Sequence, residues 1–208
     1  MITATTAASA SSKTGEIEVY VTSDINAAIA GTVEVSAARF DAAADNTPAL
    51  VARADYSMDA LGSAQVLATS IADVLAAVGA SERNEAFVRV SATSGEGDDA
   101  QTSVSYLFLD DFNNVDTLQP AAVELEVASD NERASKTVAS ITLTSNATAA
   151  FVTLETDHAL LPGHFSDNAL MLLPGTLNAA TIEFVGDSEF TTKELEASLT
   201  VRSLRDTY

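Results

Sequence analysis

Polar and apolar residues alternate in several short segments of the first half of the chain. The segments are residues 16–22, 32–36, 87–91 and 104–109. Successive side chains of a β-strand point to opposite faces, so this alternation predicts strands that bury one face in a core. The Gly-rich, acidic residues 95–99 predict a hairpin turn between the last two strands.

One segment of the first half has helical rather than strand periodicity. Residues 71–78 combine good helix formers with apolar residues at helical spacing, and Gly79 follows at the position where a helix commonly stops. We expect a single short helix here, within a domain that otherwise consists of strands.

A polar stretch at residues 110–117, followed by Pro120, predicts a domain boundary. Strand patterns then resume, with turn residues at Pro162–Gly163, Pro174–Gly175 and Gly186–Asp187. The expected strands are residues 123–127, 138–143, 151–155, 170–173, 181–185 and 195–204. Short strands with regular turns are typical of β-sandwiches, so the fold class predicted is all-β, with two tandem immunoglobulin-like sandwiches.

The predicted organisation has four parts. Residues 1–15, rich in Ala, Ser and Thr, are expected to form a flexible tail; residues 16–111 the first sandwich, 112–120 a linker and 121–208 the second sandwich. Apolar residues are 47% of the 208, enough for a core in each sandwich.

The charge of the chain argues against two classes of partner. Thirty acidic residues against ten basic ones give a formal net charge of −20. Phosphate binding needs Lys and Arg, so we expect no nucleic-acid partner, and an anionic membrane is disfavoured for the same reason. The sequence has no secretory signal and no apolar run long enough to span a membrane, so no targeting signal is expected in this chain.

The sequence offers few candidates for catalytic or metal-ligating residues. There is no cysteine, and the two histidines, His158 and His164, have no partner at metal-ligand spacing. Residues 111–122 have the acidic start of a calcium loop but carry Asp116 where the loop needs Gly and Ala122 where it needs Glu. The sequence therefore predicts no catalytic residue, no cofactor and no metal site.

Two sequence features concern carbohydrate. Asn146 begins an Asn-Ala-Thr sequon, a possible glycosylation site if the chain passes through the secretory pathway. There is no tryptophan, and the four tyrosines, including Tyr56 and Tyr106, are the candidates for stacking on a sugar.

The segment at residues 161–175 carries a resemblance to a known family. It reads Leu-Pro-Gly-His-Phe-Ser-Asp-Asn and continues into Leu-Leu-Pro-Gly, and a strand containing Glu183–Phe184 follows. Together with the end of the chain, residues 194–208, it resembles the last domain of eukaryotic, lysosomal-like β-mannosidases. Residues 21–24, 31–35 and 106–108 are similar, more weakly, to the preceding domain of those enzymes.

The family motif also has a physical interpretation. Ser166, Asp167 and Asn168 are residue types that stabilise tight turns by bonding to nearby backbone, and Phe165 can anchor the turn in the core. A structural turn is the preferred interpretation; a docking surface for another domain and direct contact with sugar are the alternatives.

The resemblance implies a role without catalysis. The parent enzymes remove terminal non-reducing β-D-mannose residues with two glutamates at strand ends of a (β/α)8 barrel, and a barrel needs roughly 250 residues. The resemblance therefore implies an accessory part of a β-mannosidase that supports a catalytic barrel absent from this chain, in a lysosomal or secretory compartment. The alternative is a stand-alone module that binds carbohydrate, such as mannosides, or another surface.

Overall fold

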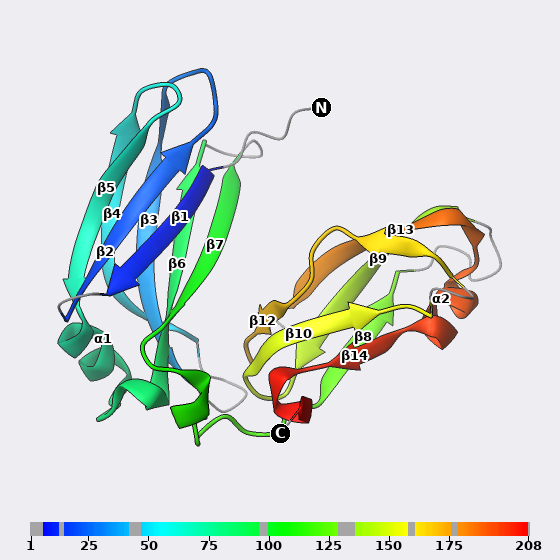
Figure 1. Ribbon diagram of the computed structural model, residues 1–208. Coiled ribbons are helices and arrows are strands. Elements are labelled where there is room, and N and C mark those ends of the chain that lie inside the picture. The colour runs from blue at the N-terminus through cyan, green and yellow to red at the C-terminus, as the bar shows by residue number, and fades with distance from the viewer. Residues whose placement is uncertain are drawn as a thin grey trace. The chain divides into compact units, whose positions relative to one another are not determined.

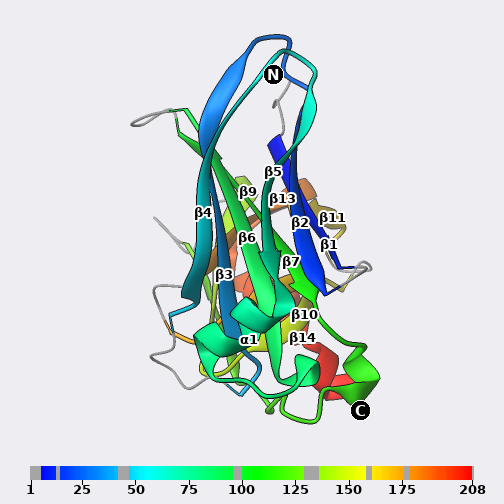
Figure 2. The same ribbon diagram turned by 90° about the vertical axis from the view of Figure 1, so that its left-hand side faces the viewer.

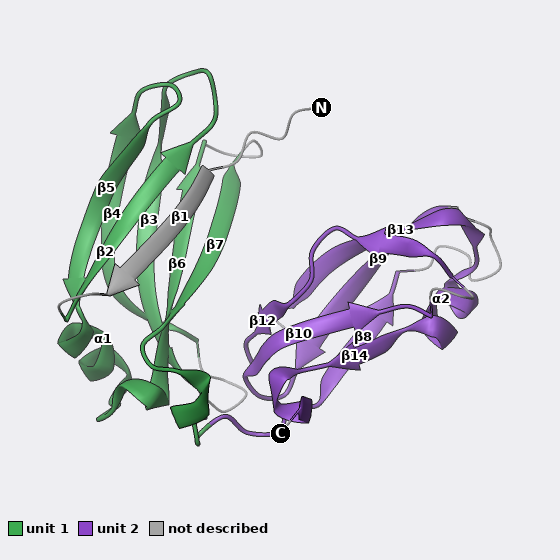
Figure 3. Cartoon of the chain, viewed as in Figure 1, with its two compact units in different colours: residues 1–40, 47–117 green, residues 41–46, 118–208 purple. Residues whose placement is uncertain are grey.

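The computed structural model describes residues 6–12, 15–41, 47–95, 100–128, 136–157, 161–175 and 179–207. The chain divides into two compact units, of which the first contains Met1–Phe40 and Thr47–Thr117 and the second contains residues 118–208 (Figure 3). The division after Thr117 falls within the segment 112–120 that was expected to be a linker. That segment includes a short 3-10 helix, η3 (Phe112–Asn114).

The first unit is a sandwich of two antiparallel sheets. One sheet has the order β1-β2-β5 and the other the order β4-β3-β6-β7 (Figures 1 and 2). The strands are β1 (Thr6–Ser12), β2 (Glu16–Ser23), β3 (Ile29–Arg39), β4 (Ala49–Met58), β5 (Ser63–Ser70), β6 (Ala86–Ser94) and β7 (Gln101–Phe108).

Alternation along the strands builds the core of this unit. Ile17, Val19 and Val21 of β2 are fully buried, and so are Val33 and Val35 of β3. Each such side chain contributes roughly 1.5–3 kcal/mol through its removal from water. The expected half-buried strands are therefore present, and they pack into one cluster between the two sheets.

The helix expected at residues 71–78 is present as α1 (Ile71–Val78). Its first turn is capped by Ser70, whose Oγ accepts a hydrogen bond from the Asp73 amide at 3.0 Å. Gly79 ends the helix in the left-handed conformation, with φ of 63°, where a residue without Cβ avoids strain.

The second unit is also a sandwich of two sheets. The larger has the order β11-β13-β9-β8 and the smaller the order β12-β10-β14. The elements are β8 (Val123–Val127), β9 (Lys136–Ser145), β10 (Ala149–Glu155), β11 (Gly163–Phe165), β12 (Leu170–Leu172), β13 (Ala180–Phe190), α2 (Thr192–Ser198), β14 (Thr200–Arg202) and a final 3-10 helix, η5 (Leu204–Thr207). The predicted all-β class with two immunoglobulin-like sandwiches is confirmed.

Three sequence-based predictions need correction. The tail expected at residues 1–15 contains β1, which pairs with β2 in antiparallel register from Thr6↔Ser23 to Ser12↔Ile17. Its Ala, Ser and Thr residues have no apolar alternation, yet the free edge of β2 offers backbone partners that outweigh propensity.

The strand expected at residues 195–204 begins as a helix instead. Thr191 and Glu194 form a capping box, in which the Thr191 amide donates to the Glu194 carboxylate at 2.7 Å and the Glu194 amide donates to Thr191 Oγ1 at 3.3 Å. Only β14 remains of the strand. Gly186–Asp187, expected to be a turn, lies inside β13, where the pairing with β9 shifts register after Val185.

Gly31, in the central strand β3, tests the packing of the first unit. A Cβ at this position would lie 2.0 Å from the carbonyl oxygen of Thr93 on β6. We expect Gly31→Ala to lower the free energy of unfolding of this unit by about 1–3 kcal/mol, through overpacking against backbone. Ala30→Ser, an exposed change on the same strand, should stay within about 0.5 kcal/mol. Calorimetric unfolding of the full chain measures both; equal stability of the two variants would contradict the packing argument.

Candidate functional site

The family motif lies where the chain crosses from one sheet of the second unit to the other. β11 pairs with β13, and β12, five residues further on, pairs with β10 of the opposite sheet. Ser166 extends the first pairing: its amide donates to the Glu183 carbonyl at 2.8 Å, and its side-chain oxygen accepts from the Glu183 amide at 2.9 Å. The hydroxyl thus takes over the acceptor role that a strand carbonyl would have.

Asn168 makes the connection to the second sheet. Its Oδ1 accepts from the Leu154 amide at 2.8 Å, and its Nδ2 donates to the Leu154 carbonyl at 2.9 Å. One side-chain amide therefore satisfies both backbone groups of a residue in β10. Oδ1 also accepts from the Ala169 amide at 3.1 Å, and Ala169 takes a positive φ of 59°. The turn is completed by Asp167, whose carboxylate accepts from the Asn168 amide at 2.7 Å.

Phe165 anchors the crossing segment to the core of the second unit. Its ring centroid lies 5.2 Å from that of Phe184, which lies 5.4 Å from that of Phe190. Gly163 allows this approach, because a Cβ there would lie 2.4 Å from the Phe184 ring. These are the contacts of a structural turn. Ser166, Asp167 and Asn168 are also exposed, so docking of another domain on this turn stays a prediction.

The remaining candidate residues do not gather into a site. His164 is exposed on β11, opposite Val185, and His158 lies outside the described residues. Within the described ranges, no group of three or more His, Cys, Asp or Glu side chains is placed to hold a metal ion. The acidic stretch that begins at Asp110 is a capped turn, in which Asn114 Nδ2 donates to the Asp110 carboxylate at 2.7 Å and holds the pKa of that carboxyl below its usual range.

Asn146 of the sequon lies exposed in the turn between β9 and β10. Its Oδ1 accepts from the Ala122 amide at 2.8 Å, so its side chain fixes the chain just before β8. Glycosylation at this residue stays a prediction.

The two tyrosines named as sugar-stacking candidates are not exposed rings. Tyr56 is only 7% exposed and belongs to the core of the first unit. Tyr106 is half-buried against Phe87, with 6.2 Å between the ring centroids, and burial raises the pKa of its hydroxyl while Arg89 offsets part of that rise. Tyr56 lies on the core side of β4, a parity that short alternating runs did not reveal. Tyr106 pairs with Arg89, on the face of its sheet opposite the core residue Val88.

An open groove of about 710 Å³ does lie at one end of the first unit. It is formed where β3 begins and β6 ends, and β4 and β7 contribute one or two residues each. Its walls combine aliphatic side chains with hydroxyl, carboxylate and carboxamide groups. The lining residues include Ile25, Ile29, Gly31, Tyr56, Ser94 and Gln101.

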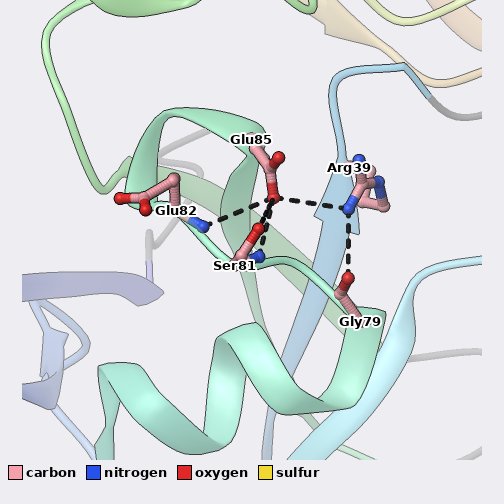
Figure 4. A network of polar contacts seen from close by, with 5 residues as sticks. All are labelled: Arg39, Gly79, Ser81, Glu82 and Glu85. Carbon is pink, nitrogen blue, oxygen red and sulfur yellow. Dashed lines mark hydrogen bonds and ion pairs between the residues drawn. The ribbon is translucent and has the colours of Figure 1, made fainter.

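A polar network holds the segment after α1 (Figure 4). The Glu85 carboxylate, at the end of η1 (Arg83–Glu85), accepts from the Ser81 amide at 2.7 Å and from the Glu82 amide at 3.4 Å. Arg39 lies 3.6 Å from the same oxygen and donates to the Gly79 carbonyl at 3.3 Å. The pKa of Glu85 is lowered, mainly by the Ser81 and Glu82 amides and further by Arg39. The network holds this turn together and joins it to the end of β3 through Arg39.

Comparison with known protein families gives a match that coincides with the second unit. Residues 118–207 match the family model Ig_mannosidase, which is described as an Ig-fold domain. The predicted resemblance to mannosidase Ig-fold domains is confirmed. The match spans the second unit, in which Ser166 and Asn168 connect the sheets. None of the curated proteins matches the chain in sequence.

Two solved structures share the fold over most of the chain. The β-D-mannosidase from Dictyoglomus thermophilum aligns with 96% of this chain at a TM-score of 0.69 and 18% identity. The exo-chitosanase CsxA from Amycolatopsis orientalis aligns with 89% at a TM-score of 0.52, also at 18% identity. The chain spans about a fifth of the first protein (21%) and about a quarter of the second (24%).

Asn168 provides a test of the crossing. Asn168→Ala removes both side-chain bonds to the backbone of Leu154, a residue that is 1% exposed, and we expect a loss of about 1–3 kcal/mol in the free energy of unfolding of the second unit. The Leu154 amide should also lose protection in hydrogen exchange. Asn146→Ala, which removes one bond at an exposed turn, is the matched control. Unchanged protection of Leu154 would contradict the assignment.

Glu85 provides a test by pH. Because its native pKa is lowered, its stabilising contribution is full above the unfolded value of about 4.3 and is lost as the pH falls through the native value. Glu85→Gln should therefore make the chain less stable than the unaltered protein at pH 7. The difference in stability between the two proteins should disappear at acidic pH. Thermal unfolding of both proteins between pH 7 and pH 3 measures it. A difference that persists unchanged at pH 3 would exclude the charged carboxylate as the cause.

Proposed function

We propose that this chain is a non-catalytic accessory part of a β-mannosidase-type glycoside hydrolase, and that it supports a catalytic barrel belonging to the same enzyme. The observation that carries the proposal is the mannosidase-type Ig-fold match over residues 118–207. The alignment of 96% of the chain with a stretch of one β-D-mannosidase adds support, because it includes the first unit as well.

The supporting role follows from what the two units contain. Their buried residues form two apolar cores, and their polar clusters at Asn168 and Glu85 serve local turns. A retaining glycosidase needs two carboxyl groups about 5–5.5 Å apart on a cleft that holds sugar. No motif assigns such a pair in this sequence, and 208 residues of strand-rich sandwich leave no room for a barrel of roughly 250.

The partner in this proposal is the catalytic barrel, and the parent substrate class is terminal non-reducing β-D-mannosides. The exposed turn at Ser166–Asn168 is the candidate contact with the barrel. The compartment would be that of the parent enzyme, lysosomal or secretory, and the sequon at Asn146 would be used there. Within the described residues, no helix is both long and apolar enough to cross a membrane.

The proposal predicts that the purified chain does not hydrolyse a chromogenic β-mannoside. The assay uses p-nitrophenyl β-D-mannoside, and fractions from a size-exclusion column are measured one by one. We expect only the background rate in the fractions that contain the 21.5 kDa chain. Hydrolysis that follows this chain through the column, and is absent from a mock purification, would overturn the accessory role.

A further inference from the structure

The sequon turn of the second unit uses the oxygen of an asparagine amide and not its nitrogen. Asn146 lies between β9 and β10 (Figure 1). Its Oδ1 accepts from the Ala122 amide at 2.8 Å, and its backbone amide donates to the Ala122 carbonyl at 3.3 Å. The Ala122 N–H needs an acceptor, so this contact fixes which side-chain atom is the oxygen. Nδ2 belongs to an exposed residue and has no hydrogen-bond partner among the described residues.

This arrangement leaves the nitrogen of Asn146 open to modification. An N-linked sugar replaces one of the two hydrogens of Nδ2 and leaves Oδ1 unaltered as an acceptor. The bond to Ala122, which holds the chain just before β8, would therefore survive the attachment of a sugar. The folded second unit is compatible with an oligosaccharide at this position.

The third residue of the triplet has the opposite environment. Thr148 has no exposed surface, and the next two residues, Ala149 and Ala150, are each 1% exposed at the start of β10. Ala149 belongs to the core of the second unit and pairs with Leu172 of β12. Exposing the Thr148 hydroxyl therefore requires that the start of β10 detach from the core.

The two ends of the triplet together restrict when it can be modified. N-glycosylation requires a hydroxyl residue two positions after the acceptor asparagine, so the transferase must reach both side chains at once. The folded unit presents Asn146 Nδ2 at its surface and keeps Thr148 inside. The acceptor triplet is therefore complete only while the start of β10 is unpaired.

We propose that Asn146 accepts an N-linked oligosaccharide before the second unit folds and is closed to the transferase afterwards. Nδ2 attacks C1 of the first sugar of an oligosaccharide carried on a lipid diphosphate. The C1–Nδ2 bond forms as the C1–O bond to the diphosphate breaks. The lipid diphosphate leaves with the bonding electrons, and one Nδ2 proton passes to a base of the transferase. The proposal rests on the secretory compartment of the proposed function and goes beyond it by stating when the site is open.

The first test is translation of the full chain, preceded by a cleavable secretory signal, in the presence of microsomes. The sequence has a single Asn-x-Ser/Thr triplet, so a mobility shift that an endoglycosidase removes reports on this site alone. We expect the shift in the unaltered chain. We expect none in Asn146→Gln, or in Thr148→Val, which keeps the branched shape of the side chain and removes its hydroxyl. Because the signal is supplied, the result does not depend on the native compartment.

The second test offers the purified, folded chain to solubilised oligosaccharyltransferase and a lipid-linked oligosaccharide. Ala28→Thr is the matched control, because it creates a second triplet at Asn26 in which all three positions are exposed. We expect modification at Asn26 and a rate at Asn146 that is lower by about 100-fold or more, since the buried triplet reacts only through local opening. Asn168→Ala, which loosens the same unit, should raise the rate at Asn146.

Three results would overturn the proposal. The first is the absence of a shift for the unaltered chain in microsomes. The second is modification of Asn146 in the folded chain as fast as that of Asn26 in Ala28→Thr. The third is loss of hydrogen-exchange protection at the Ala122 amide in the glycosylated chain, because the Asn146 oxygen keeps its bond in the proposed product. Failure of the accessory role would change none of these measurements, so the two proposals are tested separately.

Discussion

Each unit depends on burying one face of every strand against the facing sheet. Ile17, Val19 and Val21 in the first unit and Ile141, Leu143 and Phe184 in the second have no exposed surface at all. Because both sheets need this arrangement, the chain must cross between them repeatedly, and each crossing interrupts the strand ladder. The backbone groups left at a crossing need new partners, since an unpaired buried amide or carbonyl costs about as much as a lost hydrogen bond. Side chains supply these partners at Ser166 and Asn168.

This requirement explains why a family motif can be specific although its residues serve the fold rather than catalysis. Asn168 replaces a strand residue in its bonds to Leu154, and Phe165 fixes the turn against Phe184. An amide side chain offers a donor and an acceptor on neighbouring atoms, as the backbone of a paired strand does. The match to the mannosidase-type Ig-fold domain covers residues 118–207, which include this crossing.

Elements with a strong periodicity of apolar residues were predicted correctly from the sequence. Prediction failed where contacts between distant segments of the chain determine the structure. α1 and β8 have the predicted bounds, because helical spacing that ends at Gly79 and clean alternation at residues 123–127 are local signals. β1 has no local signal and exists through its pairing with β2. The groove was not predicted, because it combines residues from strands far apart in sequence. The burial of Tyr56 depends on strand parity, which no short alternating run revealed.

The central claim is that these two sandwiches serve a catalytic barrel that lies outside the 208 residues. The most direct measurement is the sequence of the transcript upstream of the codon for Met1. The account predicts that the reading frame continues into a (β/α)8 barrel with two glutamates at strand ends. A transcript whose reading frame starts at Met1, in a cell extract where no barrel protein co-purifies with the chain, would contradict the accessory role.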